Sequence, residues 1–361
     1  MSRAATEVGT PPRVHYLNAD YGIRSWLLTT DHKRIAILYL VSITVMFAIG
    51  GLGALLVRLN LLLPTGAILK PDNYNRMFSM HGIVMVFFFL VPSIPATLGN
   101  FLIPMMIGAK DLAFPKLNLL SWWVYMVGAT IGLYALTFGG VDTGWTFYAP
   151  LSTQYAYGNV SLVLMGAFLA GFSSILTGLN FIVTVHRMRA PGLTWFRLPL
   201  FVWAHYATSL LQVLATPVLA ITLLALLVER IARVGIFDPA LGGDPVLMQH
   251  LFWFYSHPAV YIMILPAMGI VSEILPVFAR KPLFGYHSMV YAIMAIAALG
   301  FMVWAHHMFA SGMNPTLGTS FMVSTMVIAV PSAIKTFNWL GSEEHTSELS
   351  HSRASRMPSS A

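Results

Sequence analysis

Apolar residues occur along the chain in long, nearly unbroken runs that are separated by short polar segments. A helix needs about 20 apolar residues to cross the hydrocarbon core of a bilayer. Eight runs reach this length, and they predict an all-α, polytopic bundle of transmembrane helices. The runs cover residues 35–59, 77–103, 118–139, 160–185, 198–228, 248–275, 289–311 and 319–340.

The positive charges between the runs predict the orientation of this bundle. Twelve Lys and Arg residues lie in the N-terminal segment and in the loops after the even-numbered runs, against four on the opposite side. Because positively charged loops stay in the cytoplasm, the N-terminus is predicted to be cytoplasmic. No apolar core precedes Ile35, so no cleaved signal peptide is expected. The net charge of +7 is spread over loops without a polybasic tract, so no nucleic-acid partner is expected either.

Composition agrees with a membrane protein and limits the chemistry that it can carry. The chain of 361 residues is 57% hydrophobic and only 9% charged, which excludes a soluble globular domain. It contains no cysteine, so disulfides and thiolate metal sites are excluded. Any bound metal must then be held by imidazole or oxygen ligands, which directs attention to the 12 histidines.

The last twenty residues, SEEHTSELSHSRASRMPSSA, differ abruptly from the rest of the chain. They are polar and rich in serine, and SEEHTSEL and SRMPSSA resemble a translated sequencing adapter. We therefore expect a transmembrane domain over residues 1–341 and a non-native tail over residues 342–361, with a disordered cytoplasmic tail as the alternative.

Histidines at hydrocarbon depth are the strongest candidates for function, because ionisable groups there are costly and usually face a partner or cofactor. His257 and Tyr261 are four residues apart, which places them on one face of a helix. The adjacent pair His306 and His307 lies in a second apolar run. Three imidazoles without a thiolate suit copper, with zinc and iron as alternatives. Any one of these histidines alone could equally be a hydrogen-bonded packing residue.

Six segments carry a resemblance to one family. The segments WFYSHPAVYIMILPAMGIVSEI, VWAHHMFASGM, MVIAVPSAIKTFNW, FSMHGIVMVFF, IGAKDLAFPKLN and AGFSSILTGLNF resemble subunit I of the haem-copper oxygen reductases, which include bacterial cytochrome c oxidase. The resemblance runs from about Thr30 to Gly341. Complete members have about a dozen spans, so it implies that this chain presents about eight of the family's twelve helices.

The resemblance implies a copper centre and a redox-active tyrosine. His257, His306 and His307 would ligate the copper of the oxygen-reducing centre. Tyr261 would be covalently bonded to His257 and would donate an electron and a proton as the O–O bond breaks.

The same resemblance implies two haems, one low-spin and one high-spin. His81 would be an axial ligand of the low-spin haem, and Arg58 would contact a haem substituent, although an arginine this near the interface could also extend to the membrane surface. His205 matches no ligand of the family and is expected to be structural or hydrogen-bonded. The remaining haem ligands of the family lie beyond the part that this chain resembles, so the chain alone is expected to be inactive.

Two tracks of polar residues can be assembled through the apolar runs as proton pathways, and the first matches the entry channel of the family. The first begins at a cytoplasmic loop and contains Asp111, Asn100, Asn118, Ser173, Ser174 and Asn180. The second contains Lys335, Thr325, Ser332 and Ser272. Asp111 alone could be an ordinary loop carboxylate, whereas a lysine inside an apolar run is rarely structural.

The first track departs from the commonest pattern of the family at its inner end. Many relatives have a glutamate where this chain has Ala259. Tyr255 lies one helical turn earlier on the same face, and with Ser256 it offers a hydroxyl in nearly the same space. A subgroup of the family has this Tyr-Ser pair, which implies that Tyr255 and Ser256 relay protons; the alternative is that Tyr255 only fills the space left by alanine.

As a whole, the resemblance implies the core subunit of a terminal respiratory oxidase in the bacterial inner membrane. It would reduce O2 to water with electrons from cytochrome c and translocate protons. Its partners would be subunit II with the dicopper site, subunit III, cytochrome c and membrane lipid. Quinol as the donor stays open, a nitric oxide reductase is disfavoured by Tyr261, Asp111 and Lys335, and a passive proton channel or transporter gives no reason for the histidine cluster.

Overall fold

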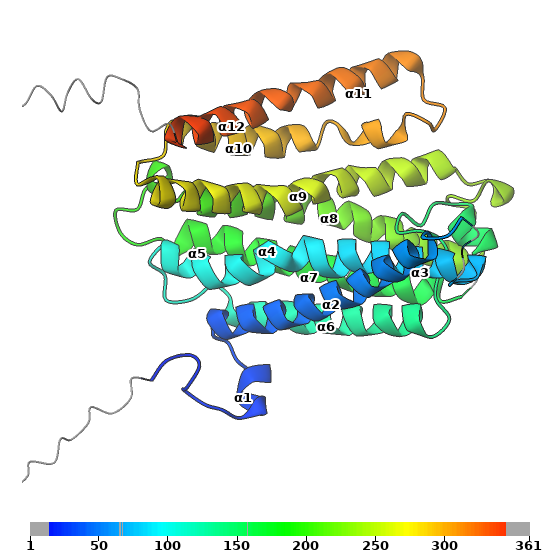
Figure 1. Cartoon of the computed structure of the whole chain (residues 1–361), viewed down its shortest axis with the longest axis horizontal. Coiled ribbons are helices and arrows are strands. Elements are labelled where there is room, and N and C mark those ends of the chain that lie inside the picture. The colour runs from blue at the N-terminus through cyan, green and yellow to red at the C-terminus, as the bar shows by residue number, and fades with distance from the viewer. Residues whose placement is uncertain (1–13, 65, 67, 157, 344–361) are drawn as a thin grey trace, which may run out of the picture.

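The computed structural model describes residues 14–343 apart from residues 65, 67 and 157. Within these residues the regular elements are helices, and the long ones lie side by side in one bundle (Figure 1), which confirms the all-α prediction. The α-helices are α1 (Ile23–Leu27), α2 (His32–Asn60), α3 (Pro71–Ile83), α4 (Val91–Ile94), α5 (Asn100–Met106), α6 (Pro115–Thr137), α7 (Val160–Arg187), α8 (Leu200–Ala232), α9 (Pro245–Ala279), α10 (Tyr286–Gly300), α11 (Pro315–Val327) and α12 (Ala329–Glu343). Shorter π- and 3-10-helical segments are η1 (Val84–Leu90), η2 (Pro95–Gly99), η3 (Leu151–Tyr155), η4 (Trp195–Arg197), η5 (Pro239–Leu241) and η6 (Trp304–Met308).

Seven helical segments in the described part of the chain are long and apolar enough to cross a membrane. They match seven of the eight predicted runs. They are His32–Asn60, Pro71–Met106, Pro115–Thr137, Val160–Arg187, Leu200–Ala232, Pro245–Ala279 and Pro315–Ser342.

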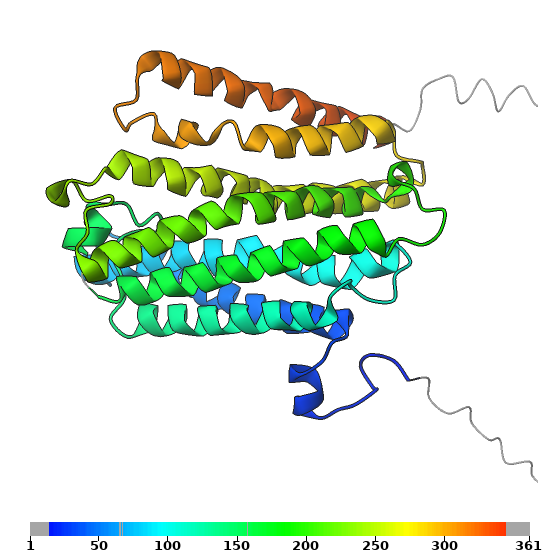
Figure 2. The same ribbon diagram turned by 180° about the vertical axis from the view of Figure 1, so that it is seen from behind.

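The prediction of one continuous helix over residues 289–311 is wrong. α10 ends at Gly300, and the chain then continues irregularly into the 3-10 turn η6, which carries His306 and His307. Figures 1 and 2 show this broken segment running alongside α11 and α12, so it still passes along the bundle. Hydropathy alone hides the break because the sequence stays apolar through it, whereas glycine at position 300 is a weak helix former.

Close packing of consecutive helices fixes the positions of the polar residues inside the bundle. α6, α7, α8 and α9 each pack along the next (Figure 2). Gly128 on α6 and Gly166 on α7 let two backbones meet, because a Cβ atom on Gly128 would lie 2.7 Å from the carbonyl oxygen of Gly166. Small residues at such contacts are the usual means by which helices associate in a membrane.

The ends of the chain lie partly outside the described residues. Ser342 and Glu343 continue α12 beyond the predicted boundary, and the Ser342 hydroxyl accepts a hydrogen bond of 2.9 Å from the backbone N–H of Phe284. The structure does not describe residues 344–361, which are the rest of the predicted tail. It also does not describe residues 1–13, which belong to the N-terminal segment where no signal peptide is expected.

Candidate functional site

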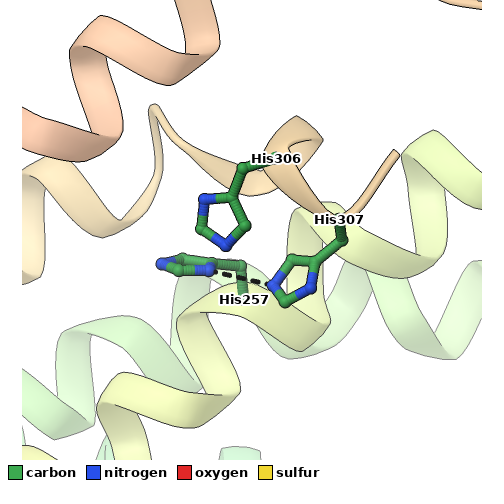
Figure 3. Close-up of side chains that lie close together, drawn as sticks. All are labelled: His257, His306 and His307. Carbon is green, nitrogen blue, oxygen red and sulfur yellow. Dashed lines mark hydrogen bonds between the residues drawn. The ribbon is translucent and has the colours of Figure 1, made fainter. Parts of the chain in front are cut away.

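Three histidines meet between α9 and η6 (Figure 3). His257 comes from the middle of α9, and His306 and His307 come from η6. One ring nitrogen from each lies within 4.8 Å of the others, and Nδ1 of His257 is 3.2 Å from Nε2 of His307. The structure therefore brings together the three residues that the sequence grouped as metal ligands.

Neighbouring side chains fix the orientation of two of these rings. Trp253 stacks on His307 with ring centroids 3.8 Å apart and an interplanar angle of 7°. The Thr325 hydroxyl donates to the carbonyl of Phe321 at 2.6 Å, so its oxygen accepts from Nδ1 of His306 at 2.9 Å. This hydrogen bond leaves Nε2 of His306 free, which is the usual arrangement for a metal-binding imidazole.

The cluster fits a cation that prefers imidazole. His257 is buried, and its Nδ1 faces Nε2 of His307 at 3.2 Å. Ring nitrogens that converge in this way can share one metal ion. Three nitrogen donors without a carboxylate in the cluster suit copper, with zinc and iron again as alternatives.

Tyr261 lies against His257, as the four-residue spacing predicts. The two ring centroids are 4.7 Å apart. The tyrosine ring is also packed against Gly300 at the end of α10, where a Cβ atom would lie 2.8 Å from Cδ2 of Tyr261. The break after α10 and the position of the tyrosine ring are therefore linked through one glycine.

The candidate haem ligand His81 is also oriented by a backbone group. Its Nδ1 donates to the carbonyl oxygen of Gly50 on α2 at 2.9 Å, which leaves Nε2 free to bind iron. Arg58 is exposed in the last turn of α2, so its contact with a haem substituent stays a prediction. His205 is buried in α8 and its Nδ1 donates to the carbonyl of Phe201 at 2.9 Å, so it is hydrogen-bonded, and its structural role stays a prediction.

The first polar track begins at a half-buried carboxylate. Asp111 lies in the loop between α5 and α6, and burial raises the pKa of its carboxyl group above the ordinary value. Inside the bundle, both polar atoms of the Asn118 side chain and Oδ1 of Asn100 are buried without a partner among the described residues. Asn180 differs, because its amide makes two hydrogen bonds of 3.0 Å to the backbone of Phe114 and so holds the loop that carries Asp111.

The same track continues to an internal cavity that reaches Tyr255. Ser173 is hydrogen-bonded to the Tyr39 hydroxyl at 3.1 Å. Ser173, Ser174 and Tyr255 line a cavity of ≈ 20 Å³, which is room for about one water molecule. Tyr255 and Ser256 are both buried, and the Ser256 hydroxyl has no partner among the described residues. The structure thus joins the inner end of the track to Tyr255, whereas proton transfer along it stays a prediction.

The second track is partly assembled. Lys335 is 0% exposed, and its Nζ lies 5.0 Å from the ring centroid of Trp339. The indole N–H of Trp339 donates to the Ser272 hydroxyl at 3.1 Å, so these residues form one group, with Ser332 one turn before the lysine on α12. Thr325 instead binds His306, at the metal cluster.

Sequence reasoning missed three contacts of the site. Trp253 lies four residues before His257 on α9, so the helical spacing could have shown that both face η6. The hydrogen bond from His306 to Thr325 and the place of Gln212 in the wall of the cavity join segments far apart in the chain. No local sequence pattern predicts these two contacts.

Comparison with known proteins identifies the family. Residues 34–347 match the family model described as cytochrome C and quinol oxidase polypeptide I. The chain is 46% identical over 310 residues to cytochrome c oxidase subunit 1 of Thermostichus vulcanus, covering 86% of this chain and 56% of that protein. It is 45% identical over 316 residues to cytochrome c oxidase subunit 1 of Bacillus subtilis (strain 168), covering 87% and 51% respectively.

A solved structure of a heme-copper terminal oxidase dimer, determined by cryo-electron microscopy, has the same fold. It superposes with a TM-score of 0.72 at 21% identity, over 90% of this chain and 55% of that chain. The chain thus spans about half the length of the relatives that it matches. The family match over residues 34–347 and the meeting of His257, His306 and His307 point to the same conclusion, that this chain belongs to the family of cytochrome c and quinol oxidase polypeptide I.

Proposed function

We propose that the full-length protein is the catalytic subunit of a terminal respiratory oxidase in a bacterial inner membrane, with its N-terminus in the cytoplasm. It reduces O2 to water with electrons from cytochrome c and couples this reaction to proton translocation. The observation that carries the proposal is the meeting of three imidazoles with Tyr261 on one side of α9. The curated relatives from Thermostichus vulcanus and Bacillus subtilis, both named cytochrome c oxidase subunit 1, support it.

The residues of the cluster hold the cofactors and fix their surroundings. His257, His306 and His307 would hold copper, and His81 would bind a low-spin haem. When bound, copper and the two haems supply electron transfer and oxygen chemistry. Tyr261 keeps its phenol beside His257, where it would give up a proton and an electron.

Protons reach the site from the cytoplasm by the two polar tracks. The raised pKa of Asp111 favours its protonated form, which suits a group that collects protons at the surface. Tyr255 and Ser256 replace the missing carboxylate at the inner end of the first track, and Lys335 serves the second. Arg58 contacts a haem substituent at the outer end of α2.

The working enzyme needs more than this chain. The chain spans about half the length of the relatives that it matches, and the rest of the full-length protein would supply the remaining haem ligands. We therefore expect the chain by itself to be inactive. Subunit II supplies the dicopper site, because this chain has no cysteine, and subunit III and cytochrome c complete the set of partners.

Metal content and one substitution test the proposal. The purified full-length protein should contain copper and two haems, and Tyr261→Phe should abolish oxygen consumption while both cofactors remain bound. Tyr134→Phe is the matched control, because Tyr134 is an exposed tyrosine on α6 far along the chain from the cluster. A protein that conducts protons but contains neither copper nor haem would instead be a passive channel.

The electron donor needs a separate assay. The family includes quinol oxidases, so oxygen consumption is measured with reduced cytochrome c and with a quinol in turn. Turnover with cytochrome c and not with quinol is expected. The opposite result would retain the oxidase and replace the donor.

A further inference from the structure

The cavity below Tyr255 is formed where α7, α8 and α9 meet. Ser174 on α7, Gln212 on α8 and Tyr255 on α9 all line it. α7 packs along α8 and α8 along α9, as Figure 2 shows, and Tyr39 of α2 and Tyr125 of α6 also line the cavity. Its ≈ 20 Å³ gives room for about one water molecule.

Gln212 presents a hydrogen-bond acceptor to this cavity. Its side chain is 2% exposed, and Oε1 has no partner among the described residues. The amide is held against Gly178 of α7, where a Cβ atom would lie 3.0 Å from Cβ and 3.1 Å from Oε1 of Gln212. Glycine at position 178 therefore leaves the space that the amide occupies.

Thr216, one turn further along α8, lies on the same face as Gln212. Its methyl group faces α7, because a Cβ atom on Gly171 would lie 3.2 Å from Cγ2 of Thr216. The threonine lies next to the Tyr255 hydroxyl, yet its Oγ1 has no partner with hydrogen-bond geometry. Ser174 Oγ is also buried without a partner among the described residues.

Buried oxygens without partners in a cavity of this size are the usual ligands of an ordered water molecule. We propose that Gln212 is a positioning residue that orients a water molecule in this cavity between Ser174 and the Tyr255 hydroxyl. Gln212, Ser174 and the Tyr255 hydroxyl, which all belong to residues in the wall of the cavity, supply the two to four polar contacts that a buried water needs.

The chemistry of an amide decides the role of Gln212. A neutral amide oxygen accepts a hydrogen bond but neither takes nor gives a proton at neutral pH. It therefore holds one O–H of the water and leaves the other O–H directed at Tyr255. When a proton reaches the water from the Ser174 side, the water passes a different proton to the Tyr255 oxygen. The phenol then releases its own proton onward along the proposed path, so the number of protons on the water and the tyrosine is unchanged.

This inference rests on the proposed proton path through Tyr255, and the experiment separates the two. The assembled full-length oxidase is prepared with Gln212→Met, which keeps the volume and removes the acceptor, and separately with Tyr255→Phe. Thr222→Val is the matched control, because Thr222 is a buried threonine on α8 whose hydroxyl already donates to Val218 at 2.7 Å. Gly178→Ala is a second variant, since the added methyl group displaces the amide of Gln212.

Two readouts are taken. Proton uptake during a single turnover is followed with a pH dye, and the O–H stretching band of a weakly hydrogen-bonded water is followed by infrared difference spectroscopy in H2¹⁶O and H2¹⁸O. Gln212→Met and Gly178→Ala should each slow proton uptake by about tenfold and shift or remove the isotope-sensitive band. Thr222→Val should change neither.

The outcomes are distinct. Normal proton uptake and an unchanged water band in Gln212→Met, with slow uptake in Tyr255→Phe, would overturn the role of Gln212 and leave the path through Tyr255 standing. Normal uptake in both variants would refute the path itself, and with it this inference. Equal slowing in Gln212→Met and Thr222→Val would show that the effect is only structural.

Discussion

Replacing Gly300 by alanine tests whether the end of α10 sets the position of Tyr261. The added Cβ atom would lie 2.8 Å from Cδ2 and 3.3 Å from Cε2 of the tyrosine ring. Non-bonded carbon atoms pack at about 3.5–4.0 Å, so the ring must move by roughly 1 Å. The ring of His257 lies at a centroid distance of 4.7 Å from the tyrosine ring, so a shift of the tyrosine also alters its contact with a candidate metal ligand.

The size of the effect follows from these distances. Overpacking a well-packed interior costs about 1–3 kcal/mol. A misplacement of about 1 Å can reduce catalysis by roughly 100-fold, because the reacting groups no longer meet in a productive geometry. We therefore expect Gly300→Ala to lower both the thermal stability and the oxygen consumption of the full-length oxidase.

The assay compares this variant with Gly51→Ala in α2, where an added Cβ atom meets nothing within 4 Å. Gly51→Ala should be neutral or should stabilise the protein by about 0.5–1 kcal/mol, as alanine does in a helix. Thermal unfolding, oxygen consumption and copper content are measured for both. If Gly300→Ala matched Gly51→Ala in stability and turnover, contact with Gly300 would not set the position of Tyr261.

Three further substitutions test other parts of the site. Asn180→Ala removes two hydrogen bonds of 3.0 Å to the backbone of Phe114, so the backbone amides of the loop with Asp111 should exchange their hydrogens faster. Unchanged hydrogen exchange would show that Asn180 does not hold this loop. Because burial raises the pKa of Asp111, the folded state binds more protons than the unfolded state, and the stability of the protein falls as pH rises above about 4. Asp111→Asn should remove this fall in stability, which is measured by thermal unfolding from pH 4 to 7. Thr325→Val leaves Nδ1 of His306 without its acceptor at 2.9 Å, so copper affinity should drop by about 10- to 100-fold in a competition titration with a chelator. A variant that binds copper as tightly as the wild type would show that Thr325 does not support His306 as a ligand.

Much of the fold and of the candidate site could be predicted from single residues and short spacings. Long apolar runs have one stable solution in a bilayer, a helix whose backbone groups are satisfied within the segment. This is why seven of the eight runs appear as spanning helices. The pair of His257 and Tyr261 could be placed on one face because four residues make about one helical turn.

Only the tertiary structure decided how separate segments meet. Hydropathy could not show that α10 ends at Gly300, because the sequence remains apolar where the helix stops. The contacts of His81 with Gly50, of His306 with Thr325 and of Gln212 with the cavity join residues on different helices, and their partners depend on helix packing and not on local pattern. The sequence by itself determined which side chains have the chemistry to bind a metal or exchange a proton. The packing of the helices decided which of them lie within reach of one another, because hydrogen bonds and metal ligation act over only a few ångströms.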